Sequence, residues 1–415
     1  MCTIGTLHNS SIRSSIKPTS MLNINQIRQE TPACQHLIHF NNAGASLNPT
    51  SVIQKIKDYL DEEAQVGGYE LARIRAHDID AFYTETARLL NAEARNIAFA
   101  TSCTEAYSKA LAAIPFKKGD IILTSDDDYA SNQLCFLSLQ ARMGVNIVRA
   151  KNLANGDIDV ADIEHIIKNQ HPSVVAITHV PTSSGKVQPI AAISKLCHQH
   201  DIWYLVDACQ SIGQMPVDVQ AIGCDFLTAT GRKFLRAPRG TGFLYVSDKA
   251  LNAGLTPQYL DNHSATWTGA DSFQVQPTAQ RFELYERSIA NVLGITEAVR
   301  YANTLGLDKI YAYNQDLIQY FRQKMRDTEG VKLYDEGSHL CNILTFRMNN
   351  VPLDTIQMAL NAAKVNHSVT LKKMAQIDFA HKGIEWAVRF SPHYYNTKEE
   401  VDRVVEVLAP LGTMK

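Results

Sequence analysis

The sequence predicts an α/β protein with one large, mostly parallel sheet and a smaller α+β domain. In the middle of the chain, short apolar runs alternate with stretches whose apolar residues recur every three or four positions. After about residue 290 this alternation is replaced by longer helical stretches and short strands. A chain of 415 residues also exceeds what one hydrophobic core usually supports.

Seven apolar runs account for the expected sheet. They are residues 96–100, 120–125, 145–150, 173–180, 203–207, 225–230 and 242–246. A helical pattern, such as the one over residues 190–200, lies between several of them. Ligands of such sheets bind where the carboxyl ends of the strands converge, so functional residues are expected directly after each run.

The second domain is expected from about Asn291 onward. Two long helical stretches, residues 291–304 and 309–326, are followed by short strands mixed with helices up to Leu411. This pattern is typical of a small α+β unit.

Composition excludes several classes of function. Hydrophobic residues make up 45% of the chain and charged residues 20%, as in ordinary soluble globular proteins. With 40 basic and 42 acidic residues, no net field attracts nucleic acid or an anionic membrane. No apolar run approaches the roughly 20 residues that span a bilayer. We therefore expect neither nucleic acid nor a membrane as a partner.

The eight cysteines are scattered without CxxC spacing. This distribution favours neither a zinc site nor a disulfide framework, so we expect no metal and a reducing, cytoplasmic location. Before Glu30 the chain has three basic residues, many serines and no acid, a weak signal for an organellar transit peptide. A frayed N-terminus, with Met21 as another start, is favoured, and residues 1–30 are a candidate for disorder.

Two residues at the ends of apolar runs carry the main chemical signal. Asp207 ends the run 203–207, and burying its charge is costly unless a positive partner, such as a protonated pyridine nitrogen, meets it. Gln210 follows three residues later and could reach a phenolate oxygen on the same pyridine ring. Lys233 follows the run 225–230 beside Arg232, and a neighbouring cation favours the neutral amine that a Schiff base requires. Considered alone, Asp207 is more simply explained as a helix cap and Lys233 as a surface lysine. Considered together, they indicate that both bind one aromatic ring that carries a pyridine nitrogen and an aldehyde.

A phosphate site is expected where the run 96–100 ends and a helix opens. The residues Ser102-Cys103-Thr104-Glu105 offer backbone N–H groups and the positive end of a helix dipole, and Thr104 adds a hydroxyl. A plain capping box, with Ser102 or Thr104 as the cap, explains these residues equally well.

The segments "THVPTSSG", "VDACQSIGQMPVDVQAIGCDF", "TGRK" and "YYNTKEEVDR" resemble the class V aminotransferase family. This family includes cysteine desulfurases, isopenicillin N epimerase-like proteins and kynureninase-like hydrolases, and the similarity runs from about Asn41 to Leu408. It implies an aspartate-aminotransferase-like fold, pyridoxal 5′-phosphate (PLP) as cofactor, and a homodimer with active sites at the interface. It also implies a large domain over residues 45–290 and a small domain from residues 1–44 and 291–415.

The resemblance implies a role for each residue that matches a family motif. At the cofactor ring, Lys233 is the Schiff-base lysine, Asp207 pairs with the pyridine nitrogen, and Gln210 faces the ring hydroxyl. The residues implied to hold phosphate are Cys103, Thr104, Thr230, Arg232 and, from the neighbouring subunit, Thr266. For the substrate, Arg389 is implied to clamp the α-carboxylate, and Asn42 to line the same pocket.

Three positions depart from the family pattern. The ring-stacking histidine is missing, so Tyr129 is the candidate stacker, while Asp128 is the stricter positional match and suits stacking poorly. Thr182 replaces an asparagine and can still donate a hydrogen bond. The stretch 365–377 contains no cysteine where related desulfurases keep the thiol that takes up sulfur.

We therefore expect an enzyme in which Lys233 removes the α-proton of an amino acid whose carboxylate Arg389 holds. The missing thiol favours carbon–sulfur bond cleavage or epimerase-type chemistry over persulfide-forming desulfuration, and transamination is an alternative. A non-catalytic PLP-fold binding protein is a further alternative. Such a protein would be expected to lose Lys233 or Arg389, and both are present.

Overall fold

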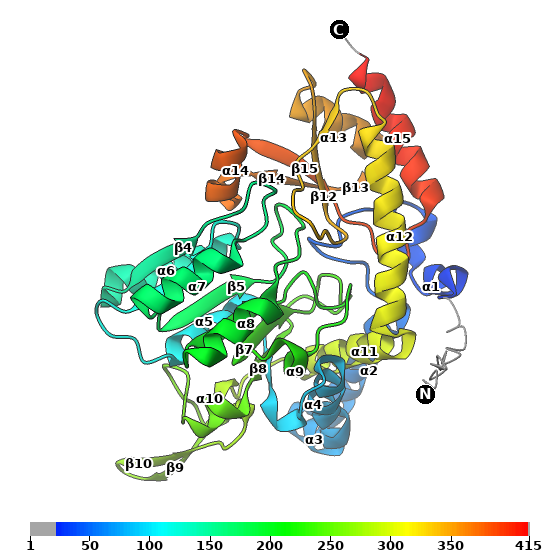
Figure 1. Cartoon of the computed structure of the whole chain (residues 1–415). Helices are drawn as coiled ribbons and strands as arrows, with labels where there is room; N and C mark the ends of the chain where they lie inside the picture. The colour runs from blue at the N-terminus through cyan, green and yellow to red at the C-terminus, as the bar shows by residue number, and fades with distance from the viewer. Residues whose placement is uncertain (1–21, 414–415) are drawn as a thin grey trace, which may run out of the picture.

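The computed structural model describes residues 22–413. Its main sheet has seven strands in the order β2-β8-β7-β6-β5-β3-β4 (Figure 1). The strands are β2 (Ile97–Ala100), β3 (Ile121–Ser125), β4 (Asn146–Ala150), β5 (Val174–Thr178), β6 (Trp203–Asp207), β7 (Phe226–Thr230) and β8 (Gly242–Val246). Only β8 runs antiparallel to its neighbours. Each of the seven predicted apolar runs forms one of these strands, which confirms the predicted sheet.

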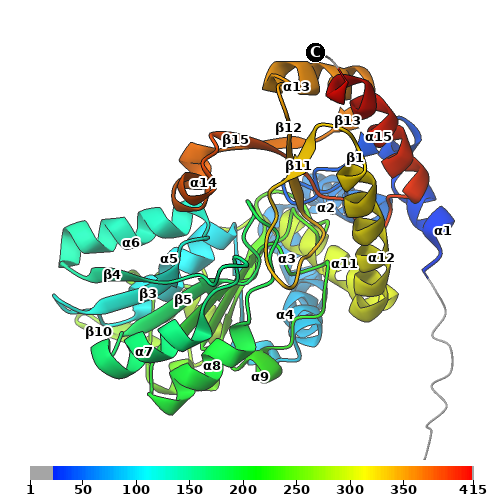
Figure 2. The same cartoon turned by 45° about the horizontal axis from the view of Figure 1, so that its top comes forward.

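Both faces of this sheet are buried. Along β5, Val174 and Ala176 pack into one core while Val175 and Ile177 pack into the other, as the period of a strand requires. The helices around the sheet are α2 (Thr50–Val66), α3 (Gly68–Ile74), α4 (Ala76–Leu90), α5 (Cys103–Ala113), α6 (Ala130–Met143), α7 (Val160–Gln170), α8 (Ile190–Gln199), α9 (Val219–Ile222), α10 (Asp248–Asn252) and α11 (Ile289–Leu305). The result is three layers, with helices on either side of the strands (Figure 2).

A smaller four-stranded sheet, in the order β11-β12-β15-β14, lies beside the large one (Figure 1). It is antiparallel throughout. The elements of this part are α1 (Ile24–Gln29), β1 (Ile38–His39), α12 (Leu307–Arg326), β11 (Val331–Leu333), β12 (Leu344–Met348), α13 (Leu353–Ala362), β13 (Val365–Asn366), β14 (Ser368–Leu371), α14 (Gln376–Lys382), β15 (Trp386–Phe390) and α15 (Lys398–Gly412). This is the α+β arrangement that the sequence predicts.

Residues from both ends of the chain share the core of this smaller part. Strand β1 pairs with β13 in parallel. The Phe40 ring lies 5.1 Å from that of Phe321 and 5.8 Å from that of Phe390, between centroids. Near the N-terminus, Arg28 donates to Glu400 of α15 over 2.8 Å. Residues 22–30 are therefore folded, contrary to the expectation of disorder, while the rest of that segment, including the transit-peptide signal, lies outside the described residues.

Helix α11 belongs to the large-sheet part, although the sequence pattern places the start of the small domain at about residue 291. It packs against α2 and α4, and Leu293 and Ile295 lie in the core of the large sheet. Its sequence is helical as expected, but helical periodicity does not reveal which core a helix joins. The change of partner comes between α11 and α12.

A hairpin of β9 (Ala265–Gly269) and β10 (Ser272–Val275) projects from the large-sheet part (Figure 1). The side chains of Trp267 and Phe273 are 80% and 62% exposed. Within residues 22–413 no helix is both long and apolar enough to cross a membrane.

Arg236 connects the two ends of the chain to the large-sheet part. It is 1% exposed, and its guanidinium donates to Thr31 over 2.6 Å, to the Leu47 carbonyl over 2.9 Å and to the Tyr394 hydroxyl over 3.0 Å. It also lies over the ring of Tyr395, 4.6 Å from the centroid. A cation with this many partners compensates for its desolvation and fixes the segments that it touches.

We expect Arg236→Met to lower the free energy of unfolding by about 3 kcal/mol, because it leaves several buried polar groups without their partner. Urea unfolding followed by circular dichroism measures this change. The matched control is Arg95→Met, at a half-exposed arginine with one ion pair to Asp248, which should change stability by about 0.5 kcal/mol or less. Equal effects of the two substitutions would contradict the role given to Arg236.

Candidate active site

The candidate site lies at one edge of the large sheet. Strand β8 is antiparallel to both β2 and β7, so β2 and β7 run in the same direction as the parallel strands. The carboxyl ends of β2, β3, β5, β6 and β7 therefore meet at this edge. The segments that carry Thr104, Tyr129, Thr182, Gln210 and Lys233 each follow one of these strands, and β15 of the smaller sheet supplies Arg389.

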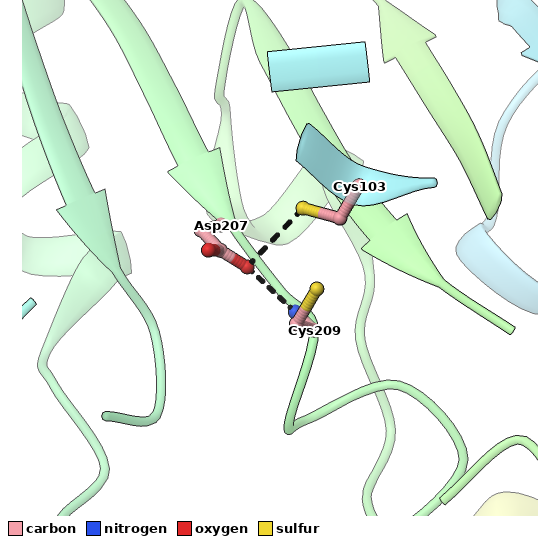
Figure 3. Close-up of side chains that lie close together, drawn as sticks. All are labelled: Cys103, Asp207 and Cys209. Atoms are coloured by element: carbon pink, nitrogen blue, oxygen red, sulfur yellow. Dashed lines mark hydrogen bonds between the residues drawn. The ribbon is translucent and has the colours of Figure 1, made fainter. Parts of the chain in front are cut away.

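Asp207 is the last residue of β6 and is 1% exposed. One carboxylate oxygen accepts a hydrogen bond from Asn132 Nδ2 over 2.9 Å. The other accepts from the backbone N–H of Cys209, also over 2.9 Å (Figure 3). A carboxylate has about four acceptor positions, so Asp207 can accept a further, charged donor.

Two thiols lie beside this carboxylate. Cys103 Sγ is 3.7 Å from Asp207 Oδ1 and donates to Thr228 Oγ1 over 3.2 Å (Figure 3). The two thiol sulfurs and one carboxylate oxygen, from Cys103, Cys209 and Asp207, all lie within 4.8 Å of one another. Contact with the Cys209 thiol, together with burial, raises the pKa of Cys103 well above its usual range. Cys103 is therefore a protonated thiol and a poor nucleophile.

Lys233 follows β7 and is 7% exposed. Its Nζ lies 5.7 Å from the centroid of the Tyr129 ring. Burial lowers the pKa of Lys233, and the Arg232 charge lowers it further, while Cys209 and Asp207 oppose the shift. Among the described residues Lys233 forms no ion pair, so its amine loses a proton more readily than that of an exposed lysine.

The structure separates the two candidates for the stacking position. Tyr129 precedes α6, and its ring faces the Lys233 amine. Asp128 points the other way, into the protein, where it accepts from Thr178 Oγ1 and, over 3.0 Å, from Asn132 Nδ2. This geometry favours Tyr129 as the residue that faces a ring.

Gln210 and Thr182 form the next part of the candidate site. Gln210 Nε2 donates to Thr182 Oγ1 over 2.8 Å and to the Ala43 carbonyl over 3.2 Å. Gln210 Oε1 is buried and has no hydrogen-bond partner among the described residues. The unpartnered oxygen is an acceptor site available to a ligand.

The loop that carries Thr182 is tied to the loop after β3. Asp127 accepts from the hydroxyls of Ser183 over 2.8 Å and of Ser184 over 2.5 Å. Lys186 Nζ lies 3.5 Å from the same carboxylate. These contacts fix the backbone on both sides of Thr182.

Arg389 forms a buried, electropositive corner. One of its terminal nitrogens donates to the carbonyl of Thr182 over 3.3 Å and to its hydroxyl, and the other donates to Asn41 Oδ1 over 3.4 Å. Its Nε has no hydrogen-bond partner in the described part of the chain, nor does the side chain form an ion pair there. Burial, with the nearby Arg232 charge, lowers the pKa of Arg389 to about 10. An unpaired buried guanidinium of this kind suits a carboxylate ligand.

Asn42 does not direct its side chain toward Arg389, contrary to expectation. It is fully buried, and its amide donates to the carbonyls of His39 and Ser391. Its oxygen accepts from Ser46 and Tyr395. The neighbouring Asn41 contacts Arg389 instead, because the chain turns over residues 41–45 and directs the two side chains differently.

The expected phosphate end is built around the start of α5. Ser102 caps this helix by accepting from the backbone N–H of Glu105 over 3.1 Å. A side chain at Gly242 would come within 3.2 Å of Cys103 N, so glycine lets β8 pass directly beneath the helix start. Thr104 is exposed, and the first N–H groups of a helix have no acceptor inside it. These features fit an anion.

The other three expected phosphate ligands either donate to backbone carbonyls or lie on the projecting hairpin. The Thr230 hydroxyl is buried and donates to the Thr241 carbonyl over 3.3 Å. Arg232 donates to the Gly44 carbonyl. Thr266 lies exposed on the projecting hairpin β9–β10, away from the main body of its own chain (Figure 1).

Two residues near the ring site were missed by the sequence reasoning. Asn132 lies four residues after Asp128, one turn along α6, a spacing that could have indicated the contact. Thr178 ends β5 and is the cross-strand partner of Asp207. Its place beside Asp207 depends on the strand register, which the separate apolar runs do not reveal.

Taken together, the donors and acceptors fit PLP. A buried carboxylate with spare acceptor capacity suits the ring nitrogen, and an amine of lowered pKa suits the aldehyde. The start of α5 suits the phosphate.

The sequence and the fold both match known proteins. The profile of the family described as Aminotransferase class-V matches residues 38–404. A probable cysteine desulfurase of Methanothermobacter thermautotrophicus is 28% identical over 396 residues, which cover 94% of this chain and 98% of that protein. A probable cysteine desulfurase of Synechocystis is 28% identical over 407 residues, covering 92% and 94%.

Solved structures show the same fold. The apo cysteine desulfurase of Thermococcus onnurineus superposes with a TM-score of 0.88 at 23% identity, covering 94% of this chain and 98% of that one. A cysteine desulfurase of Escherichia coli has a TM-score of 0.85 at 22% identity, covering 94% and 98%. The cystine C–S lyase C-DES, solved with cysteine persulfide, has a TM-score of 0.82 at 19% identity, covering 91% and 99%.

The family profile spans most of the chain, and the fold agrees with it. The chain is thus a member of the class-V aminotransferase family of PLP-dependent enzymes.

Proposed function

We propose that this enzyme removes the α-proton of an amino acid and cleaves a carbon–sulfur bond in its side chain, without a persulfide-forming cysteine of its own. The observation that carries the first half is the gathering of Lys233, Asp207 and Arg389 at the carboxyl edge of the large sheet. A buried amine, a buried carboxylate and an unpaired guanidinium face one edge of the sheet. None of the three groups has an ionic partner among the described residues. PLP with a bound amino acid would supply a partner to each: an aldehyde carbon for the amine, a ring nitrogen for the carboxylate and an α-carboxylate for the guanidinium.

When bound, PLP withdraws electrons from the bonds of the substrate's α-carbon. The protein's own residues do the rest. Arg389 holds the substrate's α-carboxylate with charge-assisted hydrogen bonds, and Asn41 orients the guanidinium. The Lys233 amine binds the cofactor and then, in its neutral form, accepts the α-proton at Nζ.

Asp207 holds the ring nitrogen in its protonated state, since a negative carboxylate favours the charged form of its partner. Gln210 and Thr182 face the ring's oxygen substituent, with Gln210 Oε1 as the free acceptor. Tyr129 covers one face of the ring. The start of α5, with Thr104, takes the phosphate, and Thr230 and Arg232 support it.

The second half of the proposal rests on the absence of a suitable thiol. The stretch 365–377 carries no cysteine and forms β13, β14 and the start of α14. Six of the seven described cysteines are buried, and the seventh, Cys135, is half-buried with a pKa raised by burial. Epimerisation and transamination begin with the same proton removal and are the alternatives.

We also propose a homodimer in a reducing, cytoplasmic compartment. The exposed hairpin carries Thr266, Trp267 and Phe273, which are suited to burial against a second copy. Thr104, at the start of α5, is exposed and accessible to such a hairpin. The described cysteines are free thiols, which fits a reducing environment.

Cofactor-free Lys233→Met should be more stable than the cofactor-free native protein at pH 7, by about 1 kcal/mol, because it removes a buried amine without an ionic partner. Folding lowers the pKa of Lys233, so the unfolded chain binds this proton more tightly and the native protein gains stability as pH rises. The difference should shrink as pH approaches the usual lysine value of about 10.4.

Urea unfolding of the two proteins from pH 7 to pH 10 measures this difference. Lys151→Met is the control, because Lys151 is 81% exposed, and it should change stability by about 0.5 kcal/mol or less. A Lys233→Met variant less stable than the native protein at pH 7 would contradict the electrostatic account.

The purified native protein, loaded with PLP, should absorb visible light and lose that absorbance on borohydride treatment. It should also exchange the α-proton of its amino-acid substrate for deuterium, which NMR detects across a panel of amino acids. Lys233→Ala should abolish both signals. Arg389→Gln should keep the absorbance but lower exchange about 100-fold or more, since it removes the charged partner of the α-carboxylate. Full exchange by Lys233→Ala would sink the proposal.

Incubation with cystine or cysteine should release a sulfur-containing product together with pyruvate and ammonia, which mass spectrometry and a coupled assay detect. No cysteine of the protein should gain 32 mass units during turnover. A trapped persulfide on any cysteine would overturn the lyase assignment. Keto-acid-dependent turnover without carbon–sulfur cleavage would replace it with transamination.

A further inference from the structure

A second buried carboxylate lies behind Asp207 and is connected to it by a single side chain. Asn132 Nδ2 donates to Asp207 Oδ2 over 2.9 Å and to Asp128 Oδ1 over 3.0 Å. Asn132 is 2% exposed and Asp128 9%. An amide nitrogen has two hydrogens, and here each meets a different carboxylate. The opposite orientation would turn the amide oxygen toward two carboxylates, so the charges alone fix this side chain.

Asp128 is held firmly in this position. It accepts from Gln133 Nε2 over 3.1 Å, from the Tyr129 backbone over 2.6 Å and from Thr178 Oγ1. Gln133 in turn accepts from Arg149 over 2.7 Å. Burial, with Asp207 adding to it, raises the pKa of Asp128 to about 6. Every hydrogen-bond partner of this carboxylate is a donor, which favours its charged form. A negative charge is thus maintained one side chain away from Asp207.

Resting on the function proposed above, we infer that Asn132 and Asp128 are positioning residues for the ring nitrogen of PLP. Asn132 fixes Asp207 so that its free acceptor position faces the ring. Asp128 orients Asn132 and adds negative charge that favours the protonated ring nitrogen. Neither residue touches the ring, and both act through Asp207.

A purely structural role is the competing account, because Asp128 also accepts from the backbone of Tyr129, the residue that caps α6. Under that account its loss would lower stability and leave the ring nitrogen unchanged. Under the inference, its loss changes the protonation of the ring nitrogen and the affinity for PLP even where the fold is intact. The two accounts therefore differ in a spectroscopic signal of the bound cofactor.

The test uses holoenzyme prepared with PLP labelled with 15N in the ring and examined by solid-state NMR, with the dissociation constant of PLP measured by fluorescence. The native protein should give the signal of a protonated ring nitrogen. Asn132→Ala and the isosteric Asp128→Asn should both move the signal toward the unprotonated ring. Each should weaken PLP binding about tenfold, as expected when one charge-assisted contact is impaired.

The matched control is Asn96→Ala. Asn96 is also a buried amide that donates to a carbonyl and to a carboxylate, that of Asp248, each over 2.8 Å. It should lower stability and leave the ring signal unchanged. If Asn132→Ala does not fold, Asp128→Asn carries the test, since it changes charge and not shape.

A native-like ring signal and affinity within twofold in Asp128→Asn would overturn the inference and leave the proposed function standing. A native protein that binds no PLP through Lys233 would overturn both.

Discussion

The architecture depends on one electrostatic constraint: an amine and a carboxylate are buried at the same edge of the sheet without being paired to each other. Asp207 ends β6, Lys233 lies three residues after the end of the neighbouring strand β7, and no ion pair joins their side chains. Asp207 is instead held by Asn132 and by the Cys209 backbone. Such an arrangement lowers the stability of the empty protein and is retained because a ligand satisfies both groups.

The rest of the fold makes this arrangement possible. Both faces of the large sheet are covered by apolar cores, which keeps the strand ends rigid. The smaller part brings β15 against the loop after β5, so that Arg389 reaches Thr182. Arg236 fixes both chain ends against the large-sheet part and thereby sets the position of that smaller sheet. Arg389 therefore meets Thr182 and Asn41, which lie 207 and 348 residues before it in the chain.

The strands could be predicted from sequence because each is a short apolar run, and in all but the edge strand β4 nearly every residue is buried. Asp207 and Lys233 stood out for the same reason, since a charge at the end of such a run needs a partner. The direction of individual side chains and the register of the strands could not be predicted from apolar runs. Whether Asn41 or Asn42 faces Arg389 depends on a local turn, and the partnership of Thr178 with Asp207 depends on register. Gly185, at φ +67°, lies against Ile343 of the smaller part, a contact that only the packing of the two parts creates.

The stacking position shows how a departure from a family pattern acquires meaning in three dimensions. From sequence, Asp128 looked like a poor substitute for a ring. In the structure, Tyr129 faces the Lys233 amine and Asp128 faces the protein interior, so an aromatic ring and a buried carboxylate come from adjacent residues. The helical spacing to Asn132 then links the interior carboxylate to the ring site.

The central claim is that Lys233 and Asp207 hold opposite ends of one PLP ring. A crystal structure of the protein grown with PLP tests this most directly. The account predicts a covalent bond from Lys233 Nζ to the aldehyde carbon and a ring nitrogen within about 2.7–2.9 Å of the Asp207 carboxylate. A cofactor bound through another lysine, or a ring nitrogen turned away from Asp207, would contradict it.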